Sequence, residues 1–137
     1  MIALTSDMET GVTKIDEQHK ELVNRLNAVI SMGTISVSKE ETQRTIDFLG
    51  EYIIKHFRDE ESLQRQSKYD KYESHKEQHQ IYIDEFKKLK EEFAANGPSA
   101  KFTVGLNTSM SNWIIRHIKI VDTEFGKYYK TQNPPAA

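Results

Sequence analysis

Four segments of this chain carry mostly apolar side chains at alternating steps of three and four residues, the spacing that places them on one face of an α-helix. The first two stripes are Ile15, His19, Leu22, Leu26, Val29 and Ile46, Leu49, Ile53, His56, Glu60, Leu63. The other two are Tyr72, His75, His79, Tyr82, Phe86, Leu89, Phe93 and Phe102, Leu106, Met110, Trp113, His117, Ile120. The pattern predicts four amphipathic helices that bury these stripes against one another.

Signals for helix starts and ends lie between the stripes. Ser38 and Glu41 form a capping-box pattern before the second helix, and Asn96-Gly97-Pro98 is a stop after the third. We predict helices over residues 16–32, 39–65, 71–95 and 100–118, after an N-terminal arm of residues 1–15. Asp16 is the expected start of the first helix, and Gly126 with the tail behind it predicts a short C-terminal segment that is no longer helical.

The connections between these helices are mostly short, so sequential helices should pack as antiparallel neighbours. This favours an all-α, up-down-up-down four-helix bundle. The length of 137 residues fits a single domain over residues 1–137, and only 6 Gly and 3 Pro are present to interrupt long helices.

Composition excludes several classes of function. A formal charge of -2 gives no electrostatic reason to expect nucleic acid or an anionic membrane as a partner. The sequence contains no apolar run long enough to span a membrane and no basic N-terminal segment followed by a hydrophobic one, so we expect a cytoplasmic protein. With no cysteine in the sequence, any metal must be held by nitrogen and oxygen.

All five histidines lie on the predicted core-facing stripes. A lone histidine on an apolar face is more often a core residue bonded to a carbonyl than a ligand. Five histidines brought to the centre of one bundle would leave up to ten ring nitrogens in need of partners, at a cost of a few kcal/mol for each unsatisfied group. A bound cation removes much of that cost.

The acidic residues sharpen this prediction. Glu60 falls on a stripe one turn after His56, where an ionised carboxylate needs a positive partner unless it lies at the solvent edge of the bundle. The pair His75 and His79 has the i, i+4 spacing that lets two imidazoles reach one metal ion. The five histidines and Glu60 make six candidate ligands. One tetrahedral zinc ion accepts only four, which favours two ions of iron or manganese. Asp122 is a candidate second bridging carboxylate only if the helix ends or distorts near residue 118.

Several motifs resemble those of the bacterial hemerythrins, in order and over nearly the whole chain. They are Gly11-Val12-Thr13-Lys14-Ile15-Asp16-Glu17-Gln18-His19, His56-Phe57 with Glu60-Glu61, His75 with His79, and Trp113-Ile114-Ile115-Arg116-His117-Ile118 with Asp122. The chain departs from the family pattern in the arm, at Leu4 or Thr5 in place of a tryptophan, and between the second and third helices, at Leu63 and Tyr69-Asp70.

The resemblance implies a ligand set and a cofactor. Three histidines would bind one iron ion and two the other, while two carboxylates and a solvent-derived oxo or hydroxo group bridge the pair. By this resemblance the three are His75, His79 and His117, the two are His19 and His56, and the bridges are Glu60 and Asp122.

The implied function is reversible, non-enzymatic binding of dioxygen, for storage, delivery or scavenging, because two histidines leave one iron with an open position. We expect Leu22, Ile53, Trp113, Ile115 and Ile118 to line the dioxygen pocket, although each could equally be plain core packing. The alternatives are a di-iron enzyme, such as a peroxidase or nitric oxide reductase, and an oxygen or redox sensor. A polar exterior favours a monomer by default.

Overall fold

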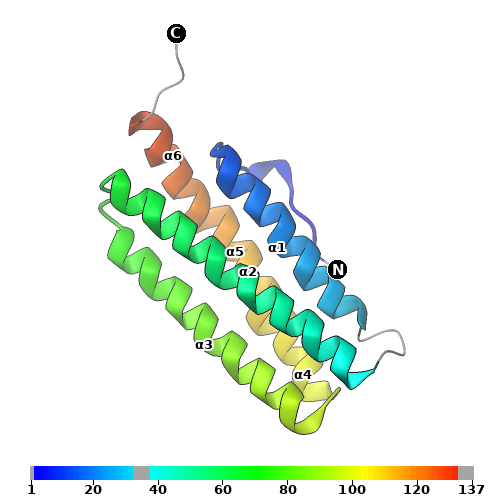
Figure 1. Cartoon of the computed structure of the whole chain (residues 1–137). Coiled ribbons are helices and arrows are strands. Elements are labelled where there is room, and N and C mark those ends of the chain that lie inside the picture. The colour runs from blue at the N-terminus through cyan, green and yellow to red at the C-terminus, as the bar shows by residue number, and fades with distance from the viewer. Residues whose placement is uncertain (1, 33–37, 133–137) are drawn as a thin grey trace.

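The computed structural model describes residues 2–32 and 38–132, and it forms the bundle of four long antiparallel helices expected from the stripes (Figure 1). Three of these helices are regular: α1 (Thr13–Met32), α2 (Lys39–Gln66) and α3 (Tyr72–Asn96). The fourth is a run of consecutive helical segments: α4 (Ala100–Gly105), η2 (Leu106–Asn112), α5 (Trp113–Arg116), η3 (His117–Asp122) and α6 (Thr123–Gln132). The described residues contain no strand, so the all-α fold class is confirmed.

The helices begin and end where short-range hydrogen bonds satisfy their free backbone groups. The Ser38 hydroxyl accepts from the Glu41 backbone N–H at 3.0 Å ahead of α2, and the Ser99 hydroxyl accepts from the Phe102 N–H at 3.0 Å ahead of α4. At the end of α3, Gly97 takes a φ of 66° and its N–H donates to a carbonyl of the last turn. These ends match the sequence prediction within one residue.

The first helix begins three residues earlier than predicted, at Thr13 rather than Asp16. The Asp16 carboxylate lies inside the first turn and accepts hydrogen bonds from the Thr10 N–H, the Thr10 hydroxyl and the Gly11 N–H at 2.9, 2.8 and 3.1 Å. Asp16 therefore turns the incoming chain back onto the helix instead of capping its start, and the arm ends at residue 12.

The predicted end of the fourth helix at residue 118 is wrong, because the chain stays helical to Gln132. Gly126 does not end the helix; it is buried where the helix passes close to the backbone of Thr10. The expected loss of helix over residues 133–137 lies outside the described residues. The segments η2 and η3 are π-helical, with wider turns that shift which side chains face inward, so Ile120 of the predicted stripe is 58% exposed.

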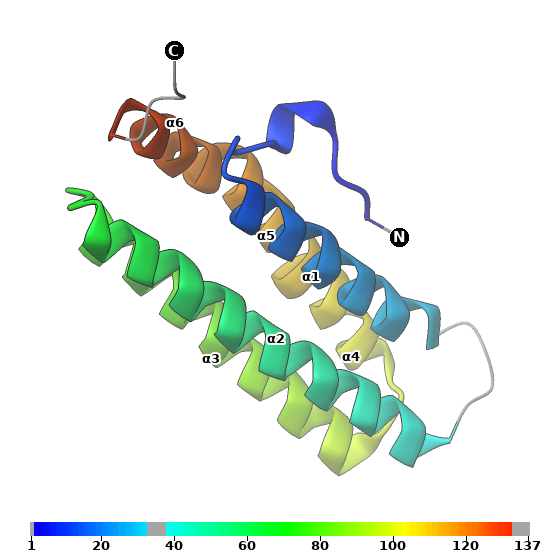
Figure 2. The same ribbon diagram turned by 45° about the horizontal axis from the view of Figure 1, so that its top comes forward.

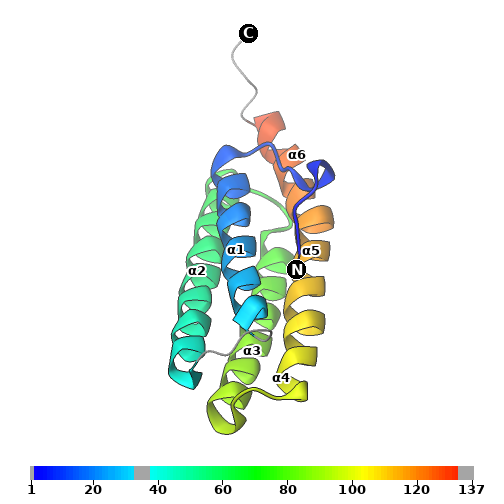
Figure 3. The ribbon, with the colours of Figure 1, turned by 90° about the vertical axis from the view of Figure 1, so that its right-hand side faces the viewer.

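The N-terminal arm includes a short 3-10 turn, η1 (Ser6–Met8), and packs on the bundle rather than extending from it (Figures 2 and 3). The Asn27 side chain of α1 exchanges two hydrogen bonds with the Ile2 backbone, at 3.0 and 2.8 Å. The main apolar core runs along the bundle, and a smaller one joins the start of α1 to α6 through Val12, Ile15, Tyr69 and Phe125. No described helix has the length and apolar character needed to cross a membrane.

Candidate metal centre

Seven imidazole and carboxylate side chains meet in the middle of the bundle, and none is more than 3% exposed. Helix α1 contributes one, and α2, α3 and η3 contribute two each, because every one of these residues lies on the inward face of its helix. The seven are the residues singled out from the sequence: His19, His56, Glu60, His75, His79, His117 and Asp122.

The larger group contains the three histidines His75, His79 and His117 together with both carboxylates. Glu60 Oε1 lies 2.9 Å from His75 Nε2 and 3.0 Å from His79 Nε2. Asp122 Oδ1 lies 3.0 Å from His75 Nε2 and 3.1 Å from His117 Nε2. The Nε2 atoms of His75 and His117 are themselves 3.0 Å apart. Five potential donor atoms therefore surround one small volume.

The smaller group contains His19 and His56 with the same two carboxylates. The second oxygen of Asp122, Oδ2, lies 2.9 Å from His19 Nε2, while Oδ1 faces the larger group. The two oxygens of Asp122 thus face two different sets of histidines. Within each group, one potential donor atom per residue can be chosen so that all lie within 4.8 Å of one another.

The unsatisfied polar atoms at this centre fit bound metal ions. Both oxygens of Glu60 and of Asp122, and Nε2 of His19, His56 and His79, are buried without a hydrogen bond of acceptable geometry, despite the short distances. Leaving such atoms unpaired costs about 1–3 kcal/mol each. Around an octahedral ion with bonds of about 2.1 Å, neighbouring ligand atoms are about 3.0 Å apart, whereas a tetrahedral ion spaces them about 3.4 Å apart. The observed spacings match the octahedral case.

The buried carboxylates of the centre also require positive charge close by. Burial and the Asp122 charge raise the pKa of Glu60, but contacts from His75 and His79 outweigh them and bring it to about 2. Burial lowers the pKa of His75, yet its contacts with Asp122 and Glu60 prevail and raise it to about 10. For His56 burial dominates, and its pKa falls from 6.5 to about 4. The carboxylates stay ionised and require cations, which are metal ions or, without them, imidazolium groups.

Two glutamines orient histidines of the centre through the ring nitrogen that faces away from it. Gln18 Oε1 lies 2.9 Å from His56 Nδ1, and Gln78 Oε1 lies 3.1 Å from His117 Nδ1. Accepting a hydrogen bond from the Nδ1–H group fixes the tautomer in which Nε2 presents its lone pair to a metal. The Gln18 amide also donates to Asp59 at 2.7 Å, which holds the glutamine in this orientation.

The two histidines of α3 have partners on α2. The half-buried Glu61 carboxylate accepts from His79 Nδ1 at 2.8 Å. The Gln64 amide nitrogen lies 2.7 Å from His75 Nδ1, and the Gln64 amide oxygen has no partner. A half-turn of this amide gives the oxygen a donor and leaves His75 Nε2 free to bind metal. Nδ1 of His19 has no hydrogen-bond partner among the described residues.

Sequence reasoning did not identify these four partners. Gln18, Glu61 and Gln78 each adjoin a predicted ligand in the sequence, and Gln64 follows Glu60 by one helical turn. Closeness in the sequence to a predicted ligand was therefore the available signal for these partners. It was too weak to use, because a neighbour of a core residue usually points away from the core, and only packing of a second helix brings it over a ring nitrogen.

The residues expected to line a dioxygen pocket divide into two sets. Leu22, Ile53 and Ile118 are fully buried in the main core, and Trp113 and Ile115 are partly buried against it. The Trp113 ring stacks on His117, with ring centroids 4.6 Å apart and an angle of 11° between the planes. Their contact with dioxygen remains a prediction.

Comparison with known proteins gives consistent results. The family model of the Hemerythrin HHE cation binding domain matches residues 10–129. A bacteriohemerythrin of Stenotrophomonas maltophilia is 25% identical over 95% of this chain and 82% of its own length, and one of Methylococcus capsulatus is 26% identical over 88% and 90%. A myohemerythrin of Sipunculus nudus is 28% identical over 81% and 79%. The crystal structure of a wild-type hemerythrin superposes with a TM-score of 0.83 at 22% identity, covering 94% of this chain and 97% of that one.

Proposed function

The chain belongs to the hemerythrin family, and from that premise we propose that it binds dioxygen reversibly at a pair of non-haem iron ions, as a carrier rather than an enzyme. The observation that carries this proposal is the sharing of two carboxylates between two unequal groups of histidines. Three histidines accompany the carboxylates in one group and two in the other. Iron suits such mixed imidazole and carboxylate ligands.

The contacts support a role for each individual ligand. His75, His79 and His117 would hold one iron ion, and His19 and His56 the other. Glu60 and Asp122 would bridge them together with an oxo or hydroxo group, a role supported by the two Asp122 oxygens that face different histidines. The ion with two histidines would have one protein ligand fewer, which would leave a position for dioxygen. When bound, the iron pair would supply two electrons to dioxygen on binding and recover them on its release.

The protein around the ligands keeps water and free protons away. All seven ligand side chains are buried, and apolar residues such as Leu22, Ile53 and Ile118 pack in the same core. Every fully buried acid or imidazole among the described residues belongs to the seven. Limiting access of water and proton donors to the centre favours reversible binding over irreversible oxidation.

Anaerobic reconstitution with ferrous iron tests the proposal. We expect a visible absorption band to appear on exposure to dioxygen and to disappear under vacuum, over several cycles. Steady turnover of added peroxide or nitric oxide by the same protein, without a reversible band, would contradict the carrier function and support a di-iron enzyme.

Replacing His79 with alanine tests the ligand assignment. His79→Ala removes one of three imidazoles from the larger group, so the iron content should fall well below two ions per chain, measured by elemental analysis after desalting. The matched control is Gln80→Ala, an exposed position one residue further along α3. An iron content equal to that of the Gln80→Ala protein would rule out His79 as a ligand.

A further inference from the structure

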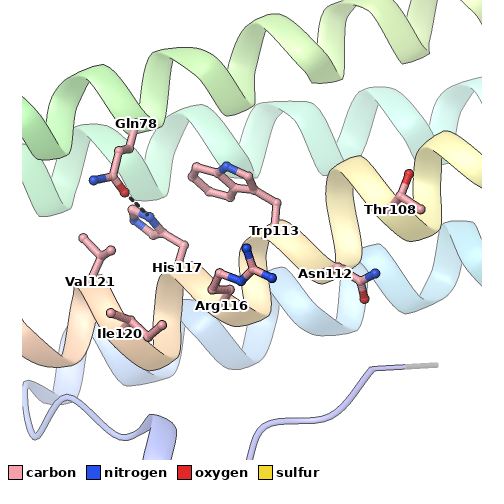
Figure 4. Close-up of a pocket in the computed structure, with 8 residues that line it drawn as sticks. All are labelled: Gln78, Thr108, Asn112, Trp113, Arg116, His117, Ile120 and Val121. Carbon is pink, nitrogen blue, oxygen red and sulfur yellow. Dashed lines mark hydrogen bonds between the residues drawn. The ribbon is translucent and has the colours of Figure 1, made fainter.

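A hollow of about 480 Å³ lies on the protein surface directly over His117 (Figure 4). Gln78 of α3 forms one side, and residues of η2, α5 and η3 form the other, among them Trp113 and Arg116. The volume falls within the range of about 300–1,000 Å³ that is typical of small-molecule sites. The hollow therefore connects solvent with a residue of the metal centre.

The only charged side chain that lines this hollow is Arg116. Arg116 is exposed, and it has no ion pair or hydrogen bond with any described residue. In Figure 4 its guanidinium extends toward Trp113 and Asn112, one turn earlier on the same helix. A guanidinium group binds carboxylates through two parallel hydrogen bonds, so the hollow offers an anion a charged donor that no described residue occupies.

The rest of the lining favours an organic anion over an inorganic one. Trp113, Ile120 and Val121 give the hollow an apolar wall, and Ile120 is 58% exposed although it is a large aliphatic side chain. The amide of Asn112 provides a further polar contact at the edge. A carboxylate with a short apolar body can satisfy the guanidinium and cover the exposed isoleucine together.

Gln78 belongs to the metal centre rather than to the anion site. Its amide oxygen accepts from His117 Nδ1 at 3.1 Å, and in Figure 4 Gln78 lies at the opposite end of the hollow from the Arg116 guanidinium. One short carboxylate paired with Arg116 therefore meets Trp113 and does not also reach the Gln78 amide.

We propose that this hollow binds a small organic carboxylate through Arg116 and Trp113. The inference does not depend on the proposed function, because neither Arg116 nor Trp113 belongs to the group of candidate metal ligands.

Butyrate is a suitable probe, with butyramide as its uncharged analogue of similar shape. Calorimetric titration of the iron-loaded protein should give a dissociation constant for butyrate on the order of 1 mM. Because Trp113 is the only tryptophan of the chain, a change in its near-ultraviolet circular dichroism would place the ligand in the hollow. Arg116→Ala should weaken butyrate binding about tenfold. Arg58→Ala, which removes another exposed arginine without a described partner, should leave binding unchanged.

Three results would overturn the inference: equal binding of butyrate and butyramide, equal binding of inorganic phosphate, or equal loss of butyrate binding in the Arg58→Ala and Arg116→Ala proteins. Reversible dioxygen binding without butyrate binding would overturn the inference and leave the proposed function intact. Butyrate binding at Trp113 in a protein that takes up no dioxygen would support the site and contradict the proposed function.

Discussion

Burying any one acid or imidazole of the centre by itself would cost free energy. The seven groups are tolerated in the core because they lie in contact with one another. Glu60 and Asp122 are no more than 1% exposed, and their oxygens have no well-formed hydrogen bond. Isolated carboxylates in such surroundings would cost several kcal/mol each in lost hydration. Cations held by the histidines would restore that energy.

At this scale Gln18 provides a test of how strongly the surrounding residues tune the centre. Gln18→Ala removes the acceptor from His56 Nδ1, so the imidazole loses its fixed tautomer and orientation. Iron affinity should fall by about 10- to 100-fold, measured by competition with a chelator. Gln43→Ala is the control and should not change it, because this half-buried glutamine of α2 donates to Asp47 and to no other described residue. An unchanged affinity in both proteins would show that Gln18 does not act through His56.

The low pKa of His56 predicts a pH dependence of stability in the metal-free protein. The unfolded chain takes up a proton at His56 near pH 6.5, whereas the folded protein resists protonation down to about pH 4. The unfolded state therefore binds more protons in this window, and stability falls as pH drops from 6.5 toward 4, by up to about 3 kcal/mol. The pKa values of His19, His75 and His79 are raised instead, so these groups oppose the slope near pH 6.5 and add little below about pH 6, where they are protonated in both states.

Urea unfolding of the metal-free protein at pH 6, 5.5 and 5 measures this dependence. The His56→Phe protein lacks the titrating group and should show a flatter profile above pH 5, before the carboxylates begin to titrate. Parallel profiles for the two proteins would mean that His56 is not held neutral by burial.

Among the elements, the fourth helix is the one whose geometry the site depends on most. Asp122 follows His117 by five residues, and on a regular α-helix these side chains would diverge around the cylinder. The π-helical segment η3 closes its turns over five residues instead, so both side chains face the centre and approach to 3.1 Å. The same change in register leaves Ile120 exposed and buries Ile118.

Gly126 lies at the contact between α6 and the arm, whereas Gly105 lies in α4, and the two positions should tolerate alanine differently. A Cβ at residue 126 would collide with the Thr10 carbonyl oxygen and lie 2.8 Å from the Thr10 Cβ, both of which are held by the Asp16 hydrogen bonds. Gly126→Ala should therefore destabilise the protein by about 2 kcal/mol, measured by urea unfolding of the iron-loaded form. At Gly105 the added Cβ meets only the end of the Leu89 side chain, and Gly105→Ala should change stability by less than about 1 kcal/mol. Equal effects at the two positions would contradict this account of the contact.

On the scale of the whole molecule, the centre joins all four long helices of the bundle. Each of them contributes at least one of the seven ligand side chains, so bound metal ions would link segments up to 103 residues apart, from His19 to Asp122. Ions that bind only the folded arrangement stabilise it by mass action.

Removing the metal should therefore lower the melting temperature. Without ions, seven donor atoms at the centre remain buried without proper partners, and the melting temperature should fall by at least about 10 °C. Calorimetry of the iron-loaded and chelator-treated proteins, with iron restored to the treated sample as a control for reversibility, measures the change. Equal melting temperatures would show that the centre does not contribute to stability through metal binding.

The sequence by itself determined the helices, their inward faces and the presence of the histidines on those faces. This was possible because helical periodicity is local: stripes such as Ile15 to Val29 place their members on one face whatever else the chain does. Glu60 and the pair His75 and His79 were likewise predicted from spacing, and the structure brings them together.

Only the tertiary structure decided the path of the fourth helix beyond residue 118 and the partners of the outward ring nitrogens. Spacing left Asp122 open, because a π-helical turn depends on packing against neighbouring helices and leaves no periodic trace in the sequence. Gln18 and Gln78 reach His56 and His117 across 38 and 39 residues of chain. Such contacts depend on how whole helices are placed against one another, which local periodicity does not encode.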